Sequence, residues 1–592
     1  MIFHTFQKKR HDQPLPTNWF HLIGHMSLLI GITFLITNCA TTHKGNYPFN
    51  EHHPEITLVK CPPPLKPLKN KVLKKRPIKC FIFTPPVTTT STDHHPRPRM
   101  GVWIGSARKH TSPAPLLLMP NEIAASAHFT SEYEIQFLTK IIETLSWNGV
   151  IIAFGSQLMP PQKPLPASLH PALKKSLLSC KNTLATTTAT SNPDPLTRGA
   201  YYQTFFKDCL TELKTTANFN PSHYNSQTLA HDTATFIKKM NYKKIHLVAT
   251  SYSTRAALQV LQLAPSHIDR ALFEDIYPLG YHPLDDLPWT LQSLFERLDK
   301  ACLTHPSCKK KFKPSLTAVL EEILVALTKN PITPKFATTS QGIATSTTNQ
   351  QPSPTATQKT LSNYYLDAHG YLNYILNQLH QSSSSIHLPA LLELARKGTY
   401  FSPHHSIPIP PPAYTKNPTK ALQHAFFQQL WLCGDRNALA PSLTEAALNR
   451  KLSETKIALS APLKAIVLAE WNTSPCNVVV DFNKNKKPHQ SAQTQTTQTL
   501  SSHPILILSG ALNPRFAPEL SEHPSLDLKA VLHLTANYPT QRVLFTNSCF
   551  QQIAKTFLTT KNLQQKSLTH LKKAFPCATT EKRKPFPFEL TG

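Results

Sequence analysis

Short apolar runs alternate with segments of helical periodicity beyond residue 100. The apolar runs predict strands at residues 101–106, 115–119, 150–154, 245–250 and 271–274. Between some of them, apolar residues recur every three to four positions, which predicts helices at residues 133–147, 226–242 and 254–263. Strands that alternate with helices are typical of a mostly parallel α/β sheet.

The later part of the chain changes from helical to strand patterns. Helical periods dominate residues 290–475, as at 289–301 and 316–329, and then strands are predicted at 504–509 and 530–534 and a helix at 550–559. This order predicts one α/β core interrupted by an inserted helical cap. The expected parts are a signal peptide or anchor (1–38), an arm rich in Pro and basic residues (39–100), the first part of the core (101–288), the cap with a disordered loop at 338–360 (289–475), and the second part of the core with a polar linker at 483–502 (476–592).

The N-terminus has the pattern of an export signal. Lys8, Lys9 and Arg10 precede an apolar run, residues 26–37, that ends at Asn38-Cys39-Ala40. The pattern resembles a bacterial lipoprotein signal with Cys39 as the lipidated residue, although Asn38 departs from the small residue usual before that cysteine. An uncleaved anchor helix and plain secretion are the alternatives. All three predict an exported protein, and the first two tether it to the membrane of the bacterial cell envelope.

The cysteine count fits an oxidising compartment, where disulfides persist. The chain has 11 Cys, and setting Cys39 aside leaves ten. Ten cysteines allow many connectivities, and sequence alone cannot choose one. The sequential pairing is the simplest: Cys61–Cys80, Cys180–Cys209, Cys302–Cys308, Cys433–Cys476 and Cys549–Cys577.

Composition excludes several classes of protein. The 592 residues are 40% hydrophobic, which excludes a wholly disordered chain, and no run of 18 apolar residues occurs, which excludes a polytopic membrane protein. The net charge of +29 comes from scattered basic residues, which indicates a solvated surface and no specific nucleic-acid partner. No metal or nucleotide motif is present, so we expect no cofactor and no metal site.

Residues 244–258 predict a strand, a sharp turn and a helix. The turn, Ala249-Thr250-Ser251-Tyr252-Ser253, partly matches the G-x-S-x-G nucleophile elbow, in which a strained Ser lies between strand and helix. Small residues at the outer positions, Ala249 and Ser253, keep such a turn sterically possible. The alternative is an ordinary turn with a buried polar Ser251.

Several motifs, in this order, resemble the tripeptidyl aminopeptidase and proline iminopeptidase branch of the α/β-hydrolases. Residues 251–255 stand where that branch has S-Y-G-T-R, residues 273–278 match L-D-G-V-Y-P, and residues 508–514 match L-S-G-x-x-D-P. Cys302 and Cys308 resemble the opening of its cap. The resemblance spans roughly residues 60–590. It implies an α/β-hydrolase fold with an inserted helical cap, and it supports the sequential disulfide pairing.

A hydrolase of this branch needs a Ser activated by His, an Asp that orients the His, and N–H groups that stabilise the oxyanion. The resemblance implies Ser251 as the residual nucleophile and Tyr252 as the carrier of one oxyanion N–H. Asn513 stands at the Asp position, and residues 535–548, where the His is expected, contain none. The glycine-rich oxyanion loop is replaced at residues 117–126, and a second loop, at 153–158, has lost its charged residues. Only 15 Gly occur in the whole chain.

The absence of the expected His, Asp and oxyanion-loop glycines together indicates a catalytically impaired hydrolase. We expect it to act by binding, with a peptide or a small ester or amide ligand in the cap cleft. The alternative is an active serine hydrolase or peptidase that uses Ser251 with a rewired base, either His128 or His533.

Overall fold

The structure is a computed structural model, and its chain divides into two compact units, Met1–Asn50 and Glu51–Gly592. All described residues lie in the second unit. They are 55–59, 78–86, 99–105, 114–119, 132–158, 195–217, 220–240, 242–332, 366–380, 388–398, 400, 426, 429–436, 445–454, 461–472, 474–477, 503–523, 526, 528–536, 543–560, 563 and 565–575. The expected signal, Cys39, the loop 338–360, the linker 483–502 and His128 lie outside them.

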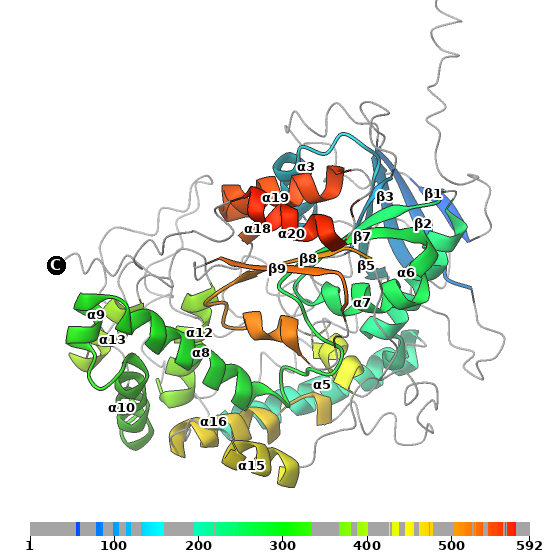
Figure 1. The fold of residues 1–592 in the computed structure, drawn as a ribbon. Coiled ribbons are helices and arrows are strands. Elements are labelled where there is room, and N and C mark those ends of the chain that lie inside the picture. Colours follow the sequence, from blue (N-terminus) through cyan, green and yellow to red (C-terminus); the bar gives the residue numbers. More distant parts are fainter. Residues whose placement is uncertain are drawn as a thin grey trace, which may run out of the picture. The chain divides into compact units, whose positions relative to one another are not determined.

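The described residues form one nine-stranded mixed sheet of order β1-β2-β3-β5-β4-β6-β7-β8-β9 (Figure 1). The first strands pair antiparallel, from β1 to β2, β3 and β5, whereas β5, β4, β6, β7, β8 and β9 run parallel. The bounds are β1 Ile56–Val59, β2 Ile78–Phe83, β3 Arg99–Gly105, β4 Leu116–Leu118, β5 Ile151–Leu158, β6 Ile245–Thr250, β7 Ile268–Glu274, β8 Ile505–Gly510 and β9 Val531–Ala536. Every residue of β6 and β8 is buried, as expected for central parallel strands covered on both faces.

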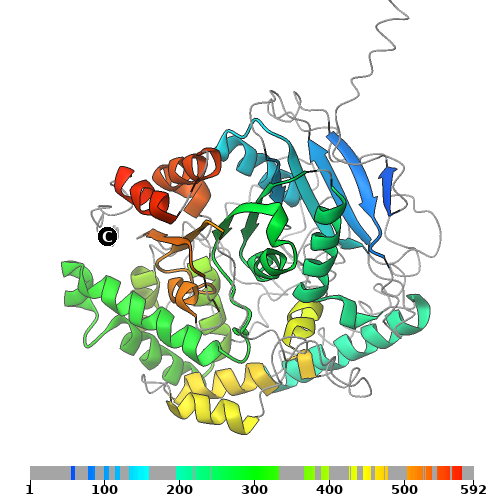
Figure 2. The ribbon, with the colours of Figure 1, turned by 45° about the vertical axis from the view of Figure 1, so that its right-hand side comes forward.

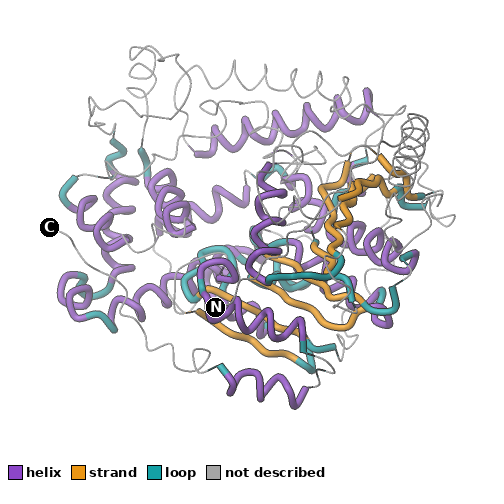
Figure 3. The backbone as a smooth tube through the Cα atoms, turned by 90° about the horizontal axis from the view of Figure 1, so that it is seen from above, coloured by secondary structure: helices purple, strands orange, loops and turns teal. Residues whose placement is uncertain are grey.

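Helices cover both faces of the sheet (Figure 3). One layer consists of α3 (Glu132–Leu145), α18 (Val543–Thr546), α19 (Ser548–Thr559) and α20 (Gln565–Ala574), and the other contains α6 (Ser226–Lys239) and α7 (Ser253–Leu263) (Figure 1). The buried side chains of α19 recur at helical spacing, namely Phe550, Ile553, Ala554, Phe557 and Leu558. This stripe packs on the sheet and joins its hydrophobic core.

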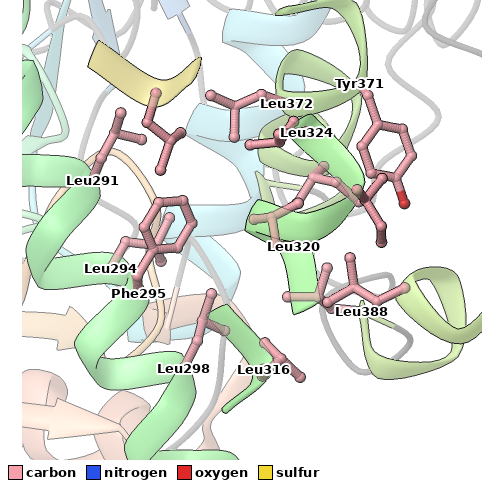
Figure 4. Close-up of a cluster of buried hydrophobic side chains, with 14 of the residues drawn as sticks. Leu291, Leu294, Phe295, Leu298, Leu316, Leu320, Leu324, Tyr371, Leu372 and Leu388 are labelled. Atoms are coloured by element: carbon pink, nitrogen blue, oxygen red, sulfur yellow. The ribbon is translucent and has the colours of Figure 1, made fainter. Parts of the chain in front are cut away.

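A helical insertion follows β7 and precedes β8. Its described helices are α8 (Leu287–Leu303), α9 (Pro306–Lys311), α10 (Leu316–Lys329), α12 (Ala368–His380), α13 (Leu388–Arg396), α15 (Glu445–Glu454) and α16 (Ala461–Asn472), coloured green to yellow in Figure 2. They bury a core of their own, in which Leu294 and Phe295 of α8 face Leu320 and Leu324 of α10 (Figure 4). The predicted cap is therefore present as a packed helical unit.

The structure has the α/β-hydrolase fold that the sequence predicts: a mixed sheet, helices on both faces and a helical insertion between two parallel strands. One segment differs from the expectation. Residues 39–100 were expected as an extended arm, but β1 and β2 belong to the sheet, and β3 begins at Arg99. The reason is the short apolar run in β2, where Cys80, Phe81 and Phe83 are buried between Pro-rich and Lys-rich flanks.

Two of the predicted disulfides are present in the structure, Cys302–Cys308 and Cys433–Cys476. Cys80, Cys209 and Cys549 are also disulfide-bonded. Their predicted partners, Cys61, Cys180 and Cys577, lie outside the described residues. Among the helices that the structure describes, none combines the length and the apolar character needed to cross a membrane.

Candidate functional site

Ser251 occupies a sharp turn between β6 and α7. Its φ is +54°, in the left-handed region that costs a residue with a side chain roughly 1–2 kcal/mol. The turn is held from both sides, because the Ser251 N–H donates to the Glu274 carbonyl at 2.7 Å and the Thr254 N–H donates to the Ser251 carbonyl at 3.0 Å. This strained strand-to-helix turn is the geometry of a nucleophile elbow.

The outer positions of the turn explain how the chain forms it without glycine. Ala249 and Ser253 are buried, and both are small. The Ser253 hydroxyl donates to the Thr250 carbonyl at 2.9 Å and accepts from the Thr250 N–H at 3.1 Å. Ser251 itself is half-buried, and no hydrogen bond reaches its Oγ from the part of the chain that the structure describes.

His533 cannot serve as a base for Ser251. Ser521 Oγ donates to the Pro518 carbonyl, so it accepts from His533 Nδ1 at 2.8 Å, which leaves Nε2 to face Ser509 Oγ at 3.1 Å. Burial lowers the pKa of His533 to about 4, so the ring is neutral. Its strand, β9, lies three strands from β6, or about 14 Å at the usual strand spacing. That form of the rewired-base hypothesis is wrong.

Asn513 is fully buried, and its side-chain oxygen is already hydrogen-bonded. Its Oδ1 accepts from the backbone N–H of Arg515 at 3.0 Å and of Phe516 at 3.1 Å. Its side-chain amide faces Asp275, the residue after β7, whose φ of +57° fits the glycine that the resembled branch has there. Asn513 therefore holds its own loop through its side-chain oxygen, and among the described residues nothing in this arrangement orients an imidazole.

Burial raises the pKa of Asp275 well above its ordinary value, and the charge of Glu274 adds to this, while the Asn513 amide and the Gly510 N–H oppose it. Burial also raises the pKa of Glu274 to about 7, against a hydrogen bond from the Leu544 N–H. Two adjacent buried carboxyl groups therefore end β7, next to the elbow. Motif letters alone do not reveal this pair, because the burial that raises the two pKa values depends on the fold.

A second feature that the sequence interpretation missed is Asp435. Tyr252, which follows Ser251, donates its hydroxyl to Asp435 Oδ2, and Arg255 Nε lies 3.6 Å from the same oxygen. Asp435 Oδ1 accepts from the N–H of Ser226 at 2.6 Å and from its hydroxyl at 2.8 Å. Burial raises the pKa of Asp435, and the Arg255 guanidinium opposes it. The only signal in the sequence is a charged pair, Asp435 and Arg436, just after a bridged cysteine.

Arg255 and a group of aromatic rings complete the surroundings of the elbow. The guanidinium donates to the carbonyls of Pro278 and Leu279, in the loop after β7, and lies 5.5 Å from the Tyr277 ring centroid. The Tyr277 ring lies 4.8 Å from that of Tyr252. The elbow therefore packs on buried aromatic rings and a buried ion pair, which fix its backbone.

The sequence predicted two altered loops near the oxyanion site, at residues 117–126 and 153–158, and the structure describes them to different extents. Residues 120–126 lie outside the described residues. The segment 153–158, expected as a loop, belongs to β5, where Ala153 pairs with Trp103 and Leu158 pairs with Arg99. No group of three or more His, Cys, Asp or Glu side chains within the described segments could hold a metal ion.

No family model matches the sequence, and no curated protein matches it. Solved structures similar to the chain include an α/β hydrolase enzyme from a Medee basin deep-sea metagenome library, with 10% identity and a TM-score of 0.29 over 79% of this chain and 96% of that one. Naproxen esterase from Bacillus subtilis has 9% identity and a TM-score of 0.27 over 84% of this chain and 99% of that one. A haloalkane dehalogenase variant from Bradyrhizobium elkanii has 10% identity and a TM-score of 0.28 over 84% and 98%. Because these TM-scores are too low to support an argument, the α/β-hydrolase fold is assigned from the strand order of the sheet and from the turn at Ser251.

Proposed function

We propose that the protein is an exported, catalytically impaired relative of the serine aminopeptidases that acts by binding. Its ligand is a peptide or a small ester or amide, held between the Ser251 elbow and the helical insertion. The observation that carries this proposal is the contrast between an intact elbow and missing partners. Ser251 keeps the strained φ of a nucleophile, whereas both nitrogens of His533 and the side-chain oxygen of Asn513 are already bonded elsewhere.

The lost base explains why binding is favoured over hydrolysis. Removal of a triad member typically lowers the rate by several powers of ten. A fluorophosphonate probe tests this directly, because it labels only an activated serine. We expect wild-type protein to be labelled no faster than the Ser251→Ala variant. Labelling of wild type that disappears in Ser251→Ala would show an active hydrolase.

If such labelling occurs, His523 is the first base to examine. It is half-buried, and burial lowers its pKa, with smaller opposing effects from the charges of Asp286 and Arg255. Loss of labelling in His523→Ala, with labelling retained in His533→Ala, would identify it as the base.

Export and membrane tethering through Cys39 belong to the same proposal and rest on the N-terminal pattern. The Cys39→Ala variant should leave the membrane fraction and appear as soluble exported protein. Unchanged membrane association would instead support an uncleaved anchor helix.

A further inference from the structure

A four-residue segment of the insertion, Cys433–Arg436, joins the helical insertion to the core behind the elbow. Its first residue is covalently bound to Cys476, which follows α16. Its two charged side chains are both buried, although unpaired charges are rarely buried in proteins. They point to different partners, one in the insertion and one in the core.

On the insertion side, Arg436 fixes the segment. Its guanidinium lies 3.1 Å from Asp285 Oδ1 and 3.2 Å from Asn477 Oδ1, the residue after the bridged Cys476. The same guanidinium lies 5.3 Å from the Trp471 ring centroid, and the Trp471 indole donates to Asp285 at 3.2 Å. The disulfide and the ion pair therefore hold the segment to the end of α16.

On the core side, the contact is closer still. A Cβ added at Gly434 would lie 2.2 Å from the Tyr224 carbonyl oxygen, so the segment touches the core backbone. Asp435 then accepts hydrogen bonds from the first residue of α6, Ser226, and from Tyr252 of the elbow. A single carboxyl group thus bonds to two core elements.

We propose that Asp435 is a positioning residue, through which the helical insertion sets the orientation of Tyr252 and of its backbone N–H at the elbow. Within the described residues, no hydrogen bond uses this N–H. It lies at the start of α7 and is available to a ligand oxygen at Ser251. The inference rests on the proposed function only in taking the elbow as the ligand site.

The consequence is mechanical coupling between two parts of the chain. The Tyr252 ring is held by its hydroxyl at Asp435 and by its tilted contact with the Tyr277 ring. If the segment shifts with the insertion, the hydroxyl contact moves with it, and the main chain at residue 252 follows. A change in the position of the insertion is therefore accompanied by a change in the backbone geometry of the elbow.

The first experiment measures the elbow with a thiol and needs neither ligand nor catalysis. In a Ser251→Cys background, the pH dependence of iodoacetamide alkylation gives the thiol pKa, since only the thiolate reacts. A helix N-terminus with a free N–H should hold this pKa below its ordinary value of about 8.5. Adding Tyr252→Phe removes the contact with Asp435 and should raise the thiol pKa by about one unit, a tenfold change in thiolate population.

Tyr277→Phe is the matched control. Tyr277 is also buried and lies against Tyr252, but its hydroxyl has no hydrogen-bond partner among the described residues. Its removal should leave the thiol pKa unchanged. An ordinary thiol pKa in the parent, equal shifts in both variants, or no shift in either would overturn the proposal. Asp435 itself is kept, because its loss would leave the buried Arg255 without a counter-charge.

The second experiment separates the two disulfides of the insertion. In Cys433→Ser/Cys476→Ser, amide hydrogens at Ser226, Thr254 and Arg255 should exchange at least tenfold faster than in wild type. In Cys302→Ser/Cys308→Ser, which removes a bridge between α8 and α9, they should not change. Equal effects at these amides, measured where circular dichroism shows both variants folded, would refute the coupling. Neither readout depends on whether Ser251 reacts with a fluorophosphonate.

Discussion

Replacing Asn513 with Asp restores the carboxylate that the resembled branch has at this position, yet we expect it to destabilise the protein. Asn513, Asp275 and Glu274 are 0%, 1% and 2% exposed. The substitution replaces the amide nitrogen, which has no hydrogen-bond partner among the described residues, and adds a third carboxyl group to the buried pair. The carboxyl oxygen that replaces the amide nitrogen would be a buried acceptor without a donor, which costs about 1–3 kcal/mol. Repulsion between buried like charges adds to this, at about 1.4 kcal/mol for each pKa unit by which a group is raised.

We therefore expect Asn513→Asp to lower the free energy of unfolding by about 3 kcal/mol at pH 8. The folded-state pKa values are raised, so the folded protein binds protons more tightly than the unfolded chain. The penalty should be smaller at pH 5 and grow as the pH rises through those values. Urea denaturation at the two pH values measures it.

Asp275→Gly is the matched partner, because glycine adopts the φ of +57° without strain. The double variant Asn513→Asp/Asp275→Gly should recover more than half of the loss, since the repulsive pair is then gone. Additive effects of the two substitutions, or a penalty independent of pH, would refute this account of why Asn replaces Asp.

Two further predictions concern stability. Glu274→Gln should keep the hydrogen bond from the Leu544 N–H. Wild type should lose stability as the pH rises above about 4.5 and through about 7, because the raised pKa of Glu274 favours the folded state only while the group is protonated. The variant should show a smaller loss over this range. Denaturation at pH 5, 7 and 8 checks this, and parallel pH profiles of the two proteins would contradict it. Gly434→Ala should lower stability by about 1–3 kcal/mol, because its Cβ meets the Tyr224 carbonyl, whereas Gly105→Ala, with nothing within 4 Å, should cost less than 1 kcal/mol. Similar melting temperatures for these two variants would show that the segment is not packed as described.

The sequence predicted the central elements well because their patterns are strong. The apolar run before Ser251 and the periodicity after it match β6 and α7 within a residue or two, and the helical period at 316–329 matches α10. It missed β1, a four-residue strand with two exposed residues, because so short a run gives no periodicity to read. It also missed α5 (Pro195–Ala217), which is only weakly amphipathic.

The candidate site could be predicted only in part. The small residues around Ser251 suffice to predict a sharp turn, because that constraint is local. The roles of Asp275 and Asp435 are not local. Asp275 acts on Asn513 across a neighbouring strand, and Asp435 acts on Ser226 and Tyr252 from far along the chain. Such pairs leave no periodic signal, so only the structure reveals them.

The contact between Ser226 and Asp435 also constrains how the chain can fold. The two residues are 209 positions apart, so α6 receives this partner for its first N–H only after most of the nascent chain has been made. Until then, Arg255 lacks the counter-charge that Asp435 supplies. Native contacts of this range slow folding and prolong the exposure of apolar surface to aggregation. A fragment that ends before the insertion therefore lacks Asp435, the buried partner of Ser226 and Arg255 in the core. We expect the core and the insertion to fold together.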